Sequence, residues 1–518
     1  MTGWLATILI FLPLGGALFI WLLPVGRVAG SIALLVALTE VGFWINALTR
    51  MDFDRTAAST NFDQRTTWFS DLHVSYHVGF YAFSFWLAGL AVVVMAAAIA
   101  YGFWVGRERP RAYFGLMLFL TSAVIGVFAS QDLLLFYVFF EAMMIPLYVL
   151  IGVWGGPGRL GATVKFVIYT MAGSLLMLAA VIVFGLSKNS FDLVDTGPSH
   201  STWLFLGFAI AFAVKAPLFP LHGWLPDAYR ESSPEVAAVL SGVISKAAIF
   251  GFIRICLVKF PGPFDDFRNV ILALAVIGLV YGSLMAFRAP DIRGVIAYSS
   301  LSQMGLITIG VFAENTAGVS GAVLQSVNHG LISATLFLLA GAIERRTSTG
   351  LFSRLGGMAR GRPALATVLM VTGVIALAVP GSSGFAGEFL ILAGVFSSGW
   401  GWTVAGATGI VLAAMYMLRL ISAVLHQEPG PAVSDTALDL RPAELGILVP
   451  LVACLIALSA WPAAISGRTI ENSAMRPALA ELGDAVPPEC EAAYEAARKQ
   501  AMREGRGTFG FTCYGPAK

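Results

Sequence analysis

Ionisable side chains inside long apolar stretches are the residues of this sequence that could do chemistry. We single out Glu141, Lys215, Lys246, Arg254, His329, Glu388 and Arg419. A charge at the centre of a bilayer costs about 2.5–3.5 kcal/mol on insertion scales, so a side chain of this kind predicts a functional site. Arg254 and Arg419 lie toward the ends of their stretches, where a long side chain can reach the membrane interface. Direct involvement is therefore the weaker interpretation for these two.

Lys215 and Lys246 stand in consecutive apolar stretches, in AFAVKAP and VISKAAIF. A carboxylate that approaches or leaves a buried lysine changes how tightly the lysine holds its proton. Glu141, which begins EAMMIP, has the chemistry of such a partner for Lys215. The alternative is a permanent ion pair that only positions helices, but a buried pair stabilises a fold poorly compared with apolar packing. We therefore favour a switchable proton site.

His329 lies in QSVNHGLIS, near the middle of its stretch and beside Asn328. An imidazole, with an ordinary pKa of about 6.5, gains and loses a proton near neutral pH. A proton relay needs such a group in a polar seam. The alternative is an interior histidine whose hydrogen bonds are simply satisfied.

Helix-breaking residues accompany two of the charges. Pro217 and Pro220 follow the first lysine in KAPLFPLHG, and PGSSG precedes Glu388. Backbone groups freed at membrane depth are tolerated only where protein or a water-filled cavity satisfies them, and discontinuous helices beside ion sites are typical of transporters. The sequence therefore predicts broken helices whose openings admit water. His222 through Tyr229 is predicted to be the exit of the first broken helix, a region of proton uptake outside the central relay.

The composition is that of a polytopic membrane protein. The chain has 518 residues, of which 58% are hydrophobic and 12% charged, whereas soluble domains carry about 25% charged residues. Apolar runs of about 18 residues or more are candidate spans. The runs are 4–24, 30–48, 79–105, 113–129, 131–153, 163–186, 203–220, 236–258, 269–287, 292–312, 318–343, 364–398, 402–425 and 443–463. The first run has no basic start and no cleavage site, so we interpret it as a retained helix. The sequence predicts an all-α fold of about fourteen transmembrane helices.

The order of the spans predicts an internal repeat. Spans four to eight and nine to thirteen form two blocks of five, and the broken helix is the fourth in each, which makes helices seven and twelve discontinuous. Because five is odd, the second block is inverted relative to the first, as in many transporters. We expect N-terminal helices at 1–111, the two repeats at 112–258 and 268–425, a last helix within 426–465 and a polar tail at 466–518.

Positive charges are distributed unevenly between the connections. Alternate connections beginning with the first hold fifteen Lys and Arg residues, and the other set, without the C-terminal tail, holds six. Cytoplasmic loops carry an excess of Lys and Arg. This predicts that the first set is cytoplasmic and that both termini lie on the opposite side of a bacterial plasma membrane.

The cysteines and one glycine motif carry weaker signals. There is no CxxC and no Cys/His cluster in the sequence, so neither a zinc site nor an iron–sulfur site is predicted. Cys490 and Cys513 lie in the polar tail, where an oxidising compartment would allow a disulfide; two unrelated thiols are the open alternative. Residues 156–161 match GxGxxG by letter, but no strand precedes them, so we interpret them as a tight turn.

Four stretches together resemble the antiporter-like membrane subunits of respiratory complex I, most closely the M-type chain (mitochondrial subunit 4). They are FYVFFEAMMIPLYVLIGVWGG, KAPLFPLHGWLPDAYRESSPEVAAVLSGVISKAAIFGFIR, DIRGVIAYSSLSQMG and VPGSSGFAGEFLIL, and the resemblance covers about residues 80 to 425. It implies fourteen helices, with helices seven and twelve discontinuous. It also implies a role in proton transfer for each of five residues: the pair Glu141 and Lys215, the central Lys246, the relay residue His329 and the terminal site Glu388.

Three positions refine the resemblance. Glu388 in GFAGEFLIL is similar to the M-type chain, whereas L-type chains and several cation-antiporter relatives tend to carry lysine there. Tyr229 stands where many members have histidine, and so does Gln303 in SLSQMG. An amide can order water but cannot carry a proton at neutral pH. Gln303 therefore puts in doubt a histidine-rich link between the two halves.

The resemblance implies a proton-translocating subunit of an NADH–quinone oxidoreductase, an enzyme subunit with no redox cofactor of its own. NADH, FMN, iron–sulfur clusters and quinone would be bound by partner subunits. The expected partners are the L- and N-type antiporter-like chains and the lipid bilayer, and no nucleic acid. The alternatives are a subunit of a multisubunit cation/proton antiporter and the membrane arm of a hydrogenase-type complex. Sodium-for-proton exchange without NADH or quinone would distinguish the antiporter.

Overall fold

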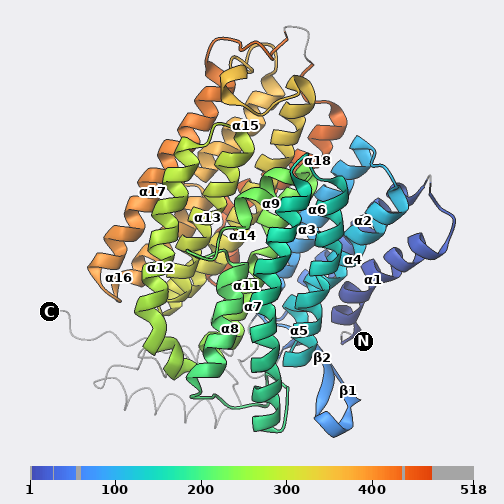
Figure 1. Cartoon of the computed structure of the whole chain (residues 1–518), viewed down its shortest axis with the longest axis vertical. Coiled ribbons are helices and arrows are strands. Elements are labelled where there is room, and N and C mark those ends of the chain that lie inside the picture. Colours follow the sequence, from blue (N-terminus) through green and yellow to red (C-terminus); the bar gives the residue numbers. More distant parts are fainter. Residues whose placement is uncertain (1–2, 27, 54–59, 435–437, 470–518) are drawn as a thin grey trace.

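The computed structural model describes residues 3–26, 28–53, 60–434 and 438–469. Helices α1–α6 form one side of a helical bundle and α12–α17 the other, and α7, α8, α11 and α14 lie between them (Figure 1). Within these described residues, twelve helices are long and apolar enough to cross a membrane, and three shorter apolar helices accompany them.

The long helices begin and end close to the predicted spans. They are α1 (Trp4–Leu22), α2 (Ala29–Leu48), α3 (Ala82–Val105), α4 (Pro110–Ala129), α7 (Arg159–Lys188), α12 (Pro261–Arg288), α13 (Ile292–Val311), α14 (Thr316–Thr347), α17 (Trp400–Ile421) and α18 (Pro442–Ala460). The fifth span is divided into α5 (Leu133–Ala142) and α6 (Met144–Trp154), because Pro146 has no N–H to donate to the carbonyl four residues earlier. Short turns η4 (Phe352–Arg354), η5 (Ser422–His426) and α19 (Ala463–Ser466) complete the second half.

Both predicted breaks are present. The seventh span consists of α8 (Thr202–Lys215), an irregular segment and α9 (Leu225–Glu231), and the twelfth consists of α15 (Pro363–Ala376) and α16 (Ser383–Phe396). Pro217 and Pro220 end the first helix because neither can donate a backbone bond. In the second break Gly381 adopts a φ of +94°, which a side chain would oppose. The backbone N–H of Phe385 donates to Ser382 Oγ at 3.2 Å, which caps α16.

The eighth span covers the predicted residues, but parts of it are not regular α-helix. It runs through α10 (Pro234–Val239), η2 (Leu240–Ile244), α11 (Lys246–Gly251) and η3 (Phe252–Leu257), and it is fully enclosed. η2 and η3 are π-helical. Such widened turns are rare and occur frequently at functional sites.

The all-α prediction needs a correction, because a β-hairpin precedes the third span. β1 (Asn61–Phe69) and β2 (Val74–Phe80) pair antiparallel, with Gln64 opposite Val78, and η1 (Ser70–Leu72) connects them. Val74 and Val78 are buried, whereas most of β1 is exposed. The third helix therefore begins at Ala82 and not at residue 79. The hairpin lies at the end of the bundle where the N-terminus also lies (Figure 1).

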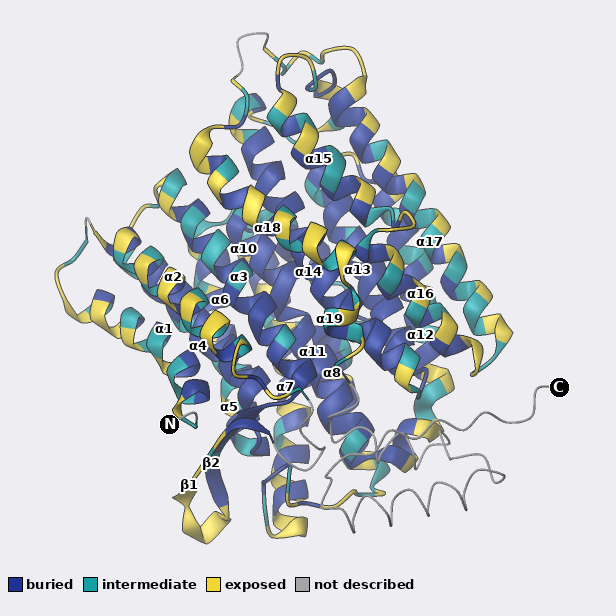
Figure 2. Cartoon of the chain, turned by 180° about the vertical axis from the view of Figure 1, so that it is seen from behind, coloured by how far each residue is buried: buried dark blue, intermediate teal, exposed yellow. Residues whose placement is uncertain are grey.

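Helix α14 is the centre of the fold. It is buried at every residue from Gly318 to Ile343 and packs against α3, α13, α16 and α18. Figure 2 shows it in the middle of the bundle, coloured as buried. Its backbone comes close to that of η2 at two glycines. A Cβ added to Gly330 would lie 2.6 Å from the carbonyl oxygen of Gly242, and one added to Gly242 would lie 3.0 Å from that of Gly330. The contact therefore requires glycine on both helices.

We predict that Gly330→Ala destabilises the protein by about 1–3 kcal/mol, the usual cost of overpacking a core. Gly446→Ala on α18 is the matched control, because nothing lies within 4 Å of the added methyl group. The measurement is denaturant unfolding of the detergent-solubilised protein. Equal stability of the two variants would contradict the close approach of the two backbones.

Candidate functional site

Lys246 is completely buried at the start of α11. Its Nζ donates to the carbonyl oxygen of Ser241 at 2.5 Å and to Ser245 Oγ at 3.3 Å. The Ser241 carbonyl belongs to the π-helical turn η2. The irregular helix therefore supplies the backbone acceptor that an ammonium needs in an apolar interior.

Further hydroxyl groups extend the polar contacts around Lys246 toward α9 and α13. Ser241 Oγ lies 2.7 Å from Ser300 Oγ on α13. Tyr229, on α9, donates its hydroxyl to the carbonyl oxygen of Leu240 at 3.2 Å and is buried. Tyr229 thus reaches the turn beside Lys246.

Lys215, the last residue of α8, is buried but holds no ion pair with Glu141 in the described part of the chain. Its Nζ lies 3.5 Å from Met144 Sδ and 4.3 Å from the centre of the Phe140 ring. The Glu141 carboxylate is close enough to act on it electrostatically, yet Glu141 Oε1 is buried without a hydrogen-bond partner among the described residues. This structure therefore does not contain the permanent ion pair considered as the alternative.

Glu388 lies at the centre of an amide cluster. Gln303 Nε2 on α13 donates to Glu388 Oε1 at 3.1 Å, and Gln325 Nε2 on α14 donates to Gln303 Oε1 at 2.9 Å. Gln325 Nε2 also lies 3.5 Å from Glu388 Oε1. Glu388 Oε2 has no hydrogen-bond partner in the described chain. The cluster joins α13, α14 and α16 around one carboxyl group.

A small cavity connects His329 with this cluster. Its volume is ≈ 20 Å³, and its wall includes Gln303, His329, Glu388 and Tyr416. A polar cavity of about 10–15 Å³ is large enough for one water molecule. His329 Nε2 is buried with no partner among the described residues, and its ring is close enough to Lys246 for the two to interact electrostatically. The neighbouring Asn328 donates to the Ser383 carbonyl at 2.7 Å, which fixes α14 against the start of α16.

The supporting residues occupy the break of the seventh span. Pro217 and Pro220 lie between α8 and α9. His222 stacks on Phe219 with ring centres 5.4 Å apart and meets Tyr281 edge-on at 5.0 Å. His222 is half-buried and belongs to neither the Lys246 contacts nor the Glu388 cluster.

The two arginines have structural partners. Arg254 Nη2 donates to the carbonyl oxygen of Leu193 at 3.0 Å, and its guanidinium lies over the Tyr81 ring. Arg419 Nη1 donates to the carbonyl oxygens of Phe287 and Ala289 at 2.5 and 2.8 Å. Both guanidinium groups tie helix ends to neighbouring segments, which fits the weaker interpretation given to them.

Three buried polar residues were not predicted from the sequence, and two of them, Gln325 and Tyr416, line the cavity beside Glu388. Glu40 on α2 is 1% exposed, and neither carboxylate oxygen has a hydrogen-bond partner in the described chain. Glu40 is an ionisable residue in the middle of span 30–48, so it meets the criterion by which the other buried charges were chosen. Gln325 stands four residues before His329, and this helical spacing could have identified it. Tyr416 carried no signal in its sequence neighbourhood.

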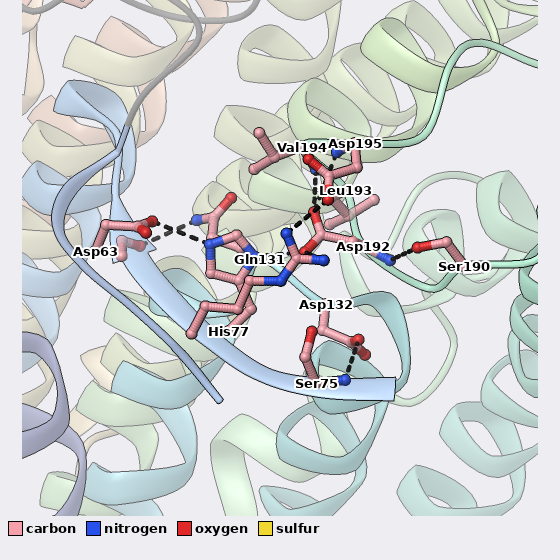
Figure 3. Close-up of polar contacts among 12 residues, drawn as sticks. Asp63, Ser75, His77, Gln131, Asp132, Ser190, Asp192, Leu193, Val194 and Asp195 are labelled. Carbon is pink, nitrogen blue, oxygen red and sulfur yellow. Dashed lines mark hydrogen bonds and ion pairs between the residues drawn. The ribbon is translucent and has the colours of Figure 1, made fainter. Parts of the chain in front are cut away.

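A second polar cluster ties the β-hairpin to the segment after α7 (Figure 3). His77 on β2 contacts two carboxylates: its Nδ1 lies 2.6 Å from Asp192 Oδ2 and its Nε2 lies 3.0 Å from Asp63 Oδ1. Arg65 on β1 donates to Asp195 Oδ2 at 2.6 Å. The partners in the second segment are more than a hundred residues away in the sequence, so the sequence pattern did not reveal the cluster.

The structure describes no metal-binding group of three or more His, Cys, Asp or Glu residues within its residue ranges. Of the cysteines that it describes, Cys256 and Cys454 are free. The predicted pair Cys490 and Cys513 lies outside the described residues.

The chain has the architecture of an antiporter-like membrane subunit, with many apolar helices, two broken helices and buried ionisable side chains. Residues 130–413 match the family model described as NADH:quinone oxidoreductase/Mrp antiporter, TM. The NADH-quinone oxidoreductase subunit M of Rickettsia prowazekii is 34% identical over 469 residues, which cover 89% of this chain and 96% of the relative. The chain therefore belongs to the family of NADH-quinone oxidoreductase subunit M, and the predicted resemblance is confirmed.

Two further comparisons agree. The subunit M of Mycobacterium tuberculosis is 35% identical, with 93% of this chain and 95% of the relative covered. A chain in the structure of respiratory complex I from Thermus thermophilus with bound NADH has a TM-score of 0.83 and 29% sequence identity, and the match covers 92% of this chain and 100% of that chain.

The stability of the hairpin cluster should depend on pH. Burial alone would lower the pKa of His77, but the hydrogen bonds and charges of Asp192 and Asp63 outweigh burial and raise the pKa to about 9. Burial alone would raise the pKa of Asp192, but His77 outweighs it and holds that pKa below its ordinary value. The stabilisation from His77 is therefore complete below about pH 6.5 and is lost as the pH rises through about 9. The stabilisation from Asp192 is lost only in acid.

We expect the amide protection factors of residues 74–80 to fall between pH 7 and pH 10 in the wild-type protein. His77→Gln should have lower protection at pH 7 and a much smaller change with pH. The measurement is hydrogen–deuterium exchange with mass spectrometry, corrected for the intrinsic exchange rate. Peptides of α14 provide the internal control. An unchanged pH profile in His77→Gln would contradict the assigned charge pairing.

Proposed function

We propose that this chain, as a subunit of an NADH-quinone oxidoreductase, moves protons along a relay of Lys215, Lys246, His329 and Glu388, with Glu141 tuning Lys215. The observation that carries the proposal is the cavity of ≈ 20 Å³ that contacts both His329 and Glu388. An imidazole and a carboxyl group facing one water-sized space can exchange a proton through a single water. Gln303, which also lines this cavity, holds the carboxyl group in place.

Electrostatic contact supports the step from Lys246 to His329. A charge on Lys246 disfavours a second positive charge on the nearby imidazole, so the two groups would be protonated alternately. The close approach of Gly242 and Gly330 holds their helices together. We infer that a proton leaving Lys246 is taken up by His329.

The first half of the relay depends on Glu141. In the described structure Lys215 contacts a thioether and an aromatic ring, which solvate an ammonium less well than a carboxylate does. A small movement that brings Glu141 into contact would strengthen the hold of Lys215 on its proton, and its withdrawal would release that proton. α8 and α11 pack against each other, so we infer that the released proton passes across this contact toward Lys246.

We further propose fourteen crossings arranged as two inverted repeats, within units 1–111, 112–258, 268–425 and 426–465. The twelve long helices, α8 with α9, and α15 with α16 support this count. Gly3 lies against the Asp63 carbonyl of the hairpin, and Arg468 lies over the Phe53 ring, so both ends of the described chain share one end of the bundle. The excess of positive charge at the other end supports a cytoplasmic location there.

The L- and N-type antiporter-like chains are the proposed neighbours within the complex, and NADH, FMN, iron–sulfur clusters and quinone are proposed to be bound by partner subunits. The alternative of a cation/proton antiporter predicts sodium-for-proton exchange in vesicles without NADH or quinone. The relatives that are 34–35% identical carry the name NADH-quinone oxidoreductase, which favours the redox-driven pump.

We predict that Lys246→Ala reduces NADH-driven proton pumping by the reconstituted complex to a small fraction of its wild-type value, because Lys246 stands between Lys215 and His329 in the proposed relay. The measurement is the pH change in vesicles per NADH oxidised. Lys188→Ala is the matched control, since Lys188 is exposed and donates to the carbonyl oxygen of Pro198. Full pumping stoichiometry in an assembled Lys246→Ala complex would contradict a role for Lys246 in the relay.

Glu141→Gln keeps the size of the side chain and removes its charge. We expect assembly to be normal and pumping to be partly lost, because Lys215 can no longer be switched by a carboxylate. Glu428→Gln controls for loss of one acidic residue, since Glu428 is exposed at the surface. Pumping equal to that of the control would show that Lys215 works without Glu141.

A further inference from the structure

Two cavities outside the relay lie against the same three helices. Figure 2 shows α3, α14 and α18 next to one another, and the three pack together. The first cavity has a volume of ≈ 220 Å³ and lies at the arginine-rich end of these helices. Its wall is formed by Trp104, Arg345, Arg346, Leu438, Arg441 and Glu444.

This cavity carries an excess of positive charge. Arg346 Nη2 lies 2.6 Å from Glu444 Oε2, so this pair is neutral as a unit. The Arg345 guanidinium lies over the Trp104 ring at 4.5 Å. Neither Arg345 nor Arg441 forms an ion pair with a residue that the structure describes. Two guanidinium charges at a helix end, beside an interfacial tryptophan, therefore lack a counter-charge within the described protein.

The second cavity is apolar. It has a volume of ≈ 180 Å³, and its lining comes from α2, α3, α14, α18 and the turn that follows: Trp44, Trp86, Gly89, Leu90, Val93, Val327, Leu331, Cys454, Ala457, Leu458 and Ile465. An apolar cavity of about 150 Å³ is large enough to bind benzene. This space therefore has room for several methylene groups.

The distance between the cavities matches one leaflet of a bilayer. Leu331 and Arg345 are fourteen residues apart on α14, and Glu444 and Cys454 are ten apart on α18. At 1.5 Å per residue these intervals correspond to about 21 and 15 Å along the helix axes. The hydrocarbon core of a bilayer is about 30 Å thick, so one leaflet is about 15 Å.

A row of small side chains on α3 connects the two cavities. Val93, Ala96, Ala97, Ala100 and Trp104 follow at helical spacing and are all partly exposed, whereas their neighbours Val94, Met95, Ala98 and Ile99 are buried. The alanines leave room along the surface of α3 for an extended chain.

We propose that one anionic phospholipid binds along α3, α14 and α18, with its phosphate between Arg345 and Arg441 and one acyl chain reaching the apolar cavity at Cys454 and Ala457. Basic pockets between transmembrane helices are suited to anionic lipid headgroups, and a guanidinium matches the geometry of a phosphate. The three features, unpaired charge, apolar cavity and one-leaflet spacing, together fit one occupant. The lipid lies against Val327 and Leu331 of α14, outside the cavity that His329 and Glu388 share.

The test uses the whole complex in nanodiscs and photoreactive phospholipids with a diazirine near the end of one acyl chain. Phosphatidylglycerol carries the probe in one sample and phosphatidylcholine in the other. After illumination, labelled peptides are identified by mass spectrometry. We expect the anionic probe to label peptides that contain residues 86–93 or 454–458 several-fold more than the zwitterionic probe does. Equal labelling by the two probes would overturn the headgroup assignment.

Variants separate the two ends of the site. Arg345→Ala combined with Arg441→Ala should remove most of this labelling, and Arg360→Ala, an exposed arginine outside the cavity, should leave it unchanged. Ala457→Phe fills the apolar end and should lower the labelling without changing any charge. Undiminished labelling in the double arginine variant would contradict the proposal. Absence of labelling in the wild-type complex, with a protein cross-link at Cys454 in its place, would assign this surface to a partner subunit.

Discussion

An ionisable side chain in the interior of a membrane protein needs polar groups around it, and a regular helix has none to offer because its own bonds use them. In this structure three ionisable residues of the candidate relay lie at or beside helix irregularities, whereas His329 lies within the continuous helix α14. Lys215 is at the end of α8, Lys246 follows the π-helical turn η2 and takes the Ser241 carbonyl, and Glu388 lies on α16 just after the second break. The helix interruptions and these three buried ionisable residues therefore occur together in the fold.

Helix α14 brings the separate sites into one structure. It carries His329, contacts the turn that holds Lys246 through Gly330, and is fixed to the start of α16 by Asn328. It also contributes Gln325 to the amide cluster around Glu388. Burying a helix with polar residues on two faces costs free energy. In α14 these residues link the Lys246 site to the amide cluster around Glu388.

The sequence predicted the membrane class, the positions of the spans and both breaks, because hydropathy and proline act locally and leave a direct trace. It did not predict the hairpin, although VSYHVGF, which forms β2, contains β-branched and aromatic residues. The partner strand β1 is mostly exposed and has little apolar pattern. The π-helical turns depend on how η2 fits against α14, and no local residue type specifies them. The amide cluster depends on three helices meeting, so the sequence could suggest Gln325 only through its spacing from His329, and Tyr416 was found only in three dimensions. Glu40 was within reach of the rule applied to the other charges, and its position in a span should have identified it.

Lys215 and Glu388 lie near helix ends that carry opposite partial charges: the C-terminus of α8 and the N-terminus of α16. The peptide dipoles of a helix add up to a partial negative charge at its C-terminus and a partial positive charge at its N-terminus. Lys215 is the C-terminal residue of α8, and Glu388 lies in the second turn of α16. The end of α8 therefore gives the ammonium a fixed partial counter-charge even when no carboxylate touches it, whereas the field at Glu388 is weaker because the effect fades beyond the first turn. The first break thus stabilises the ammonium of Lys215 through the end of α8. At the second break the carboxylate of Glu388 depends more on its amide neighbours.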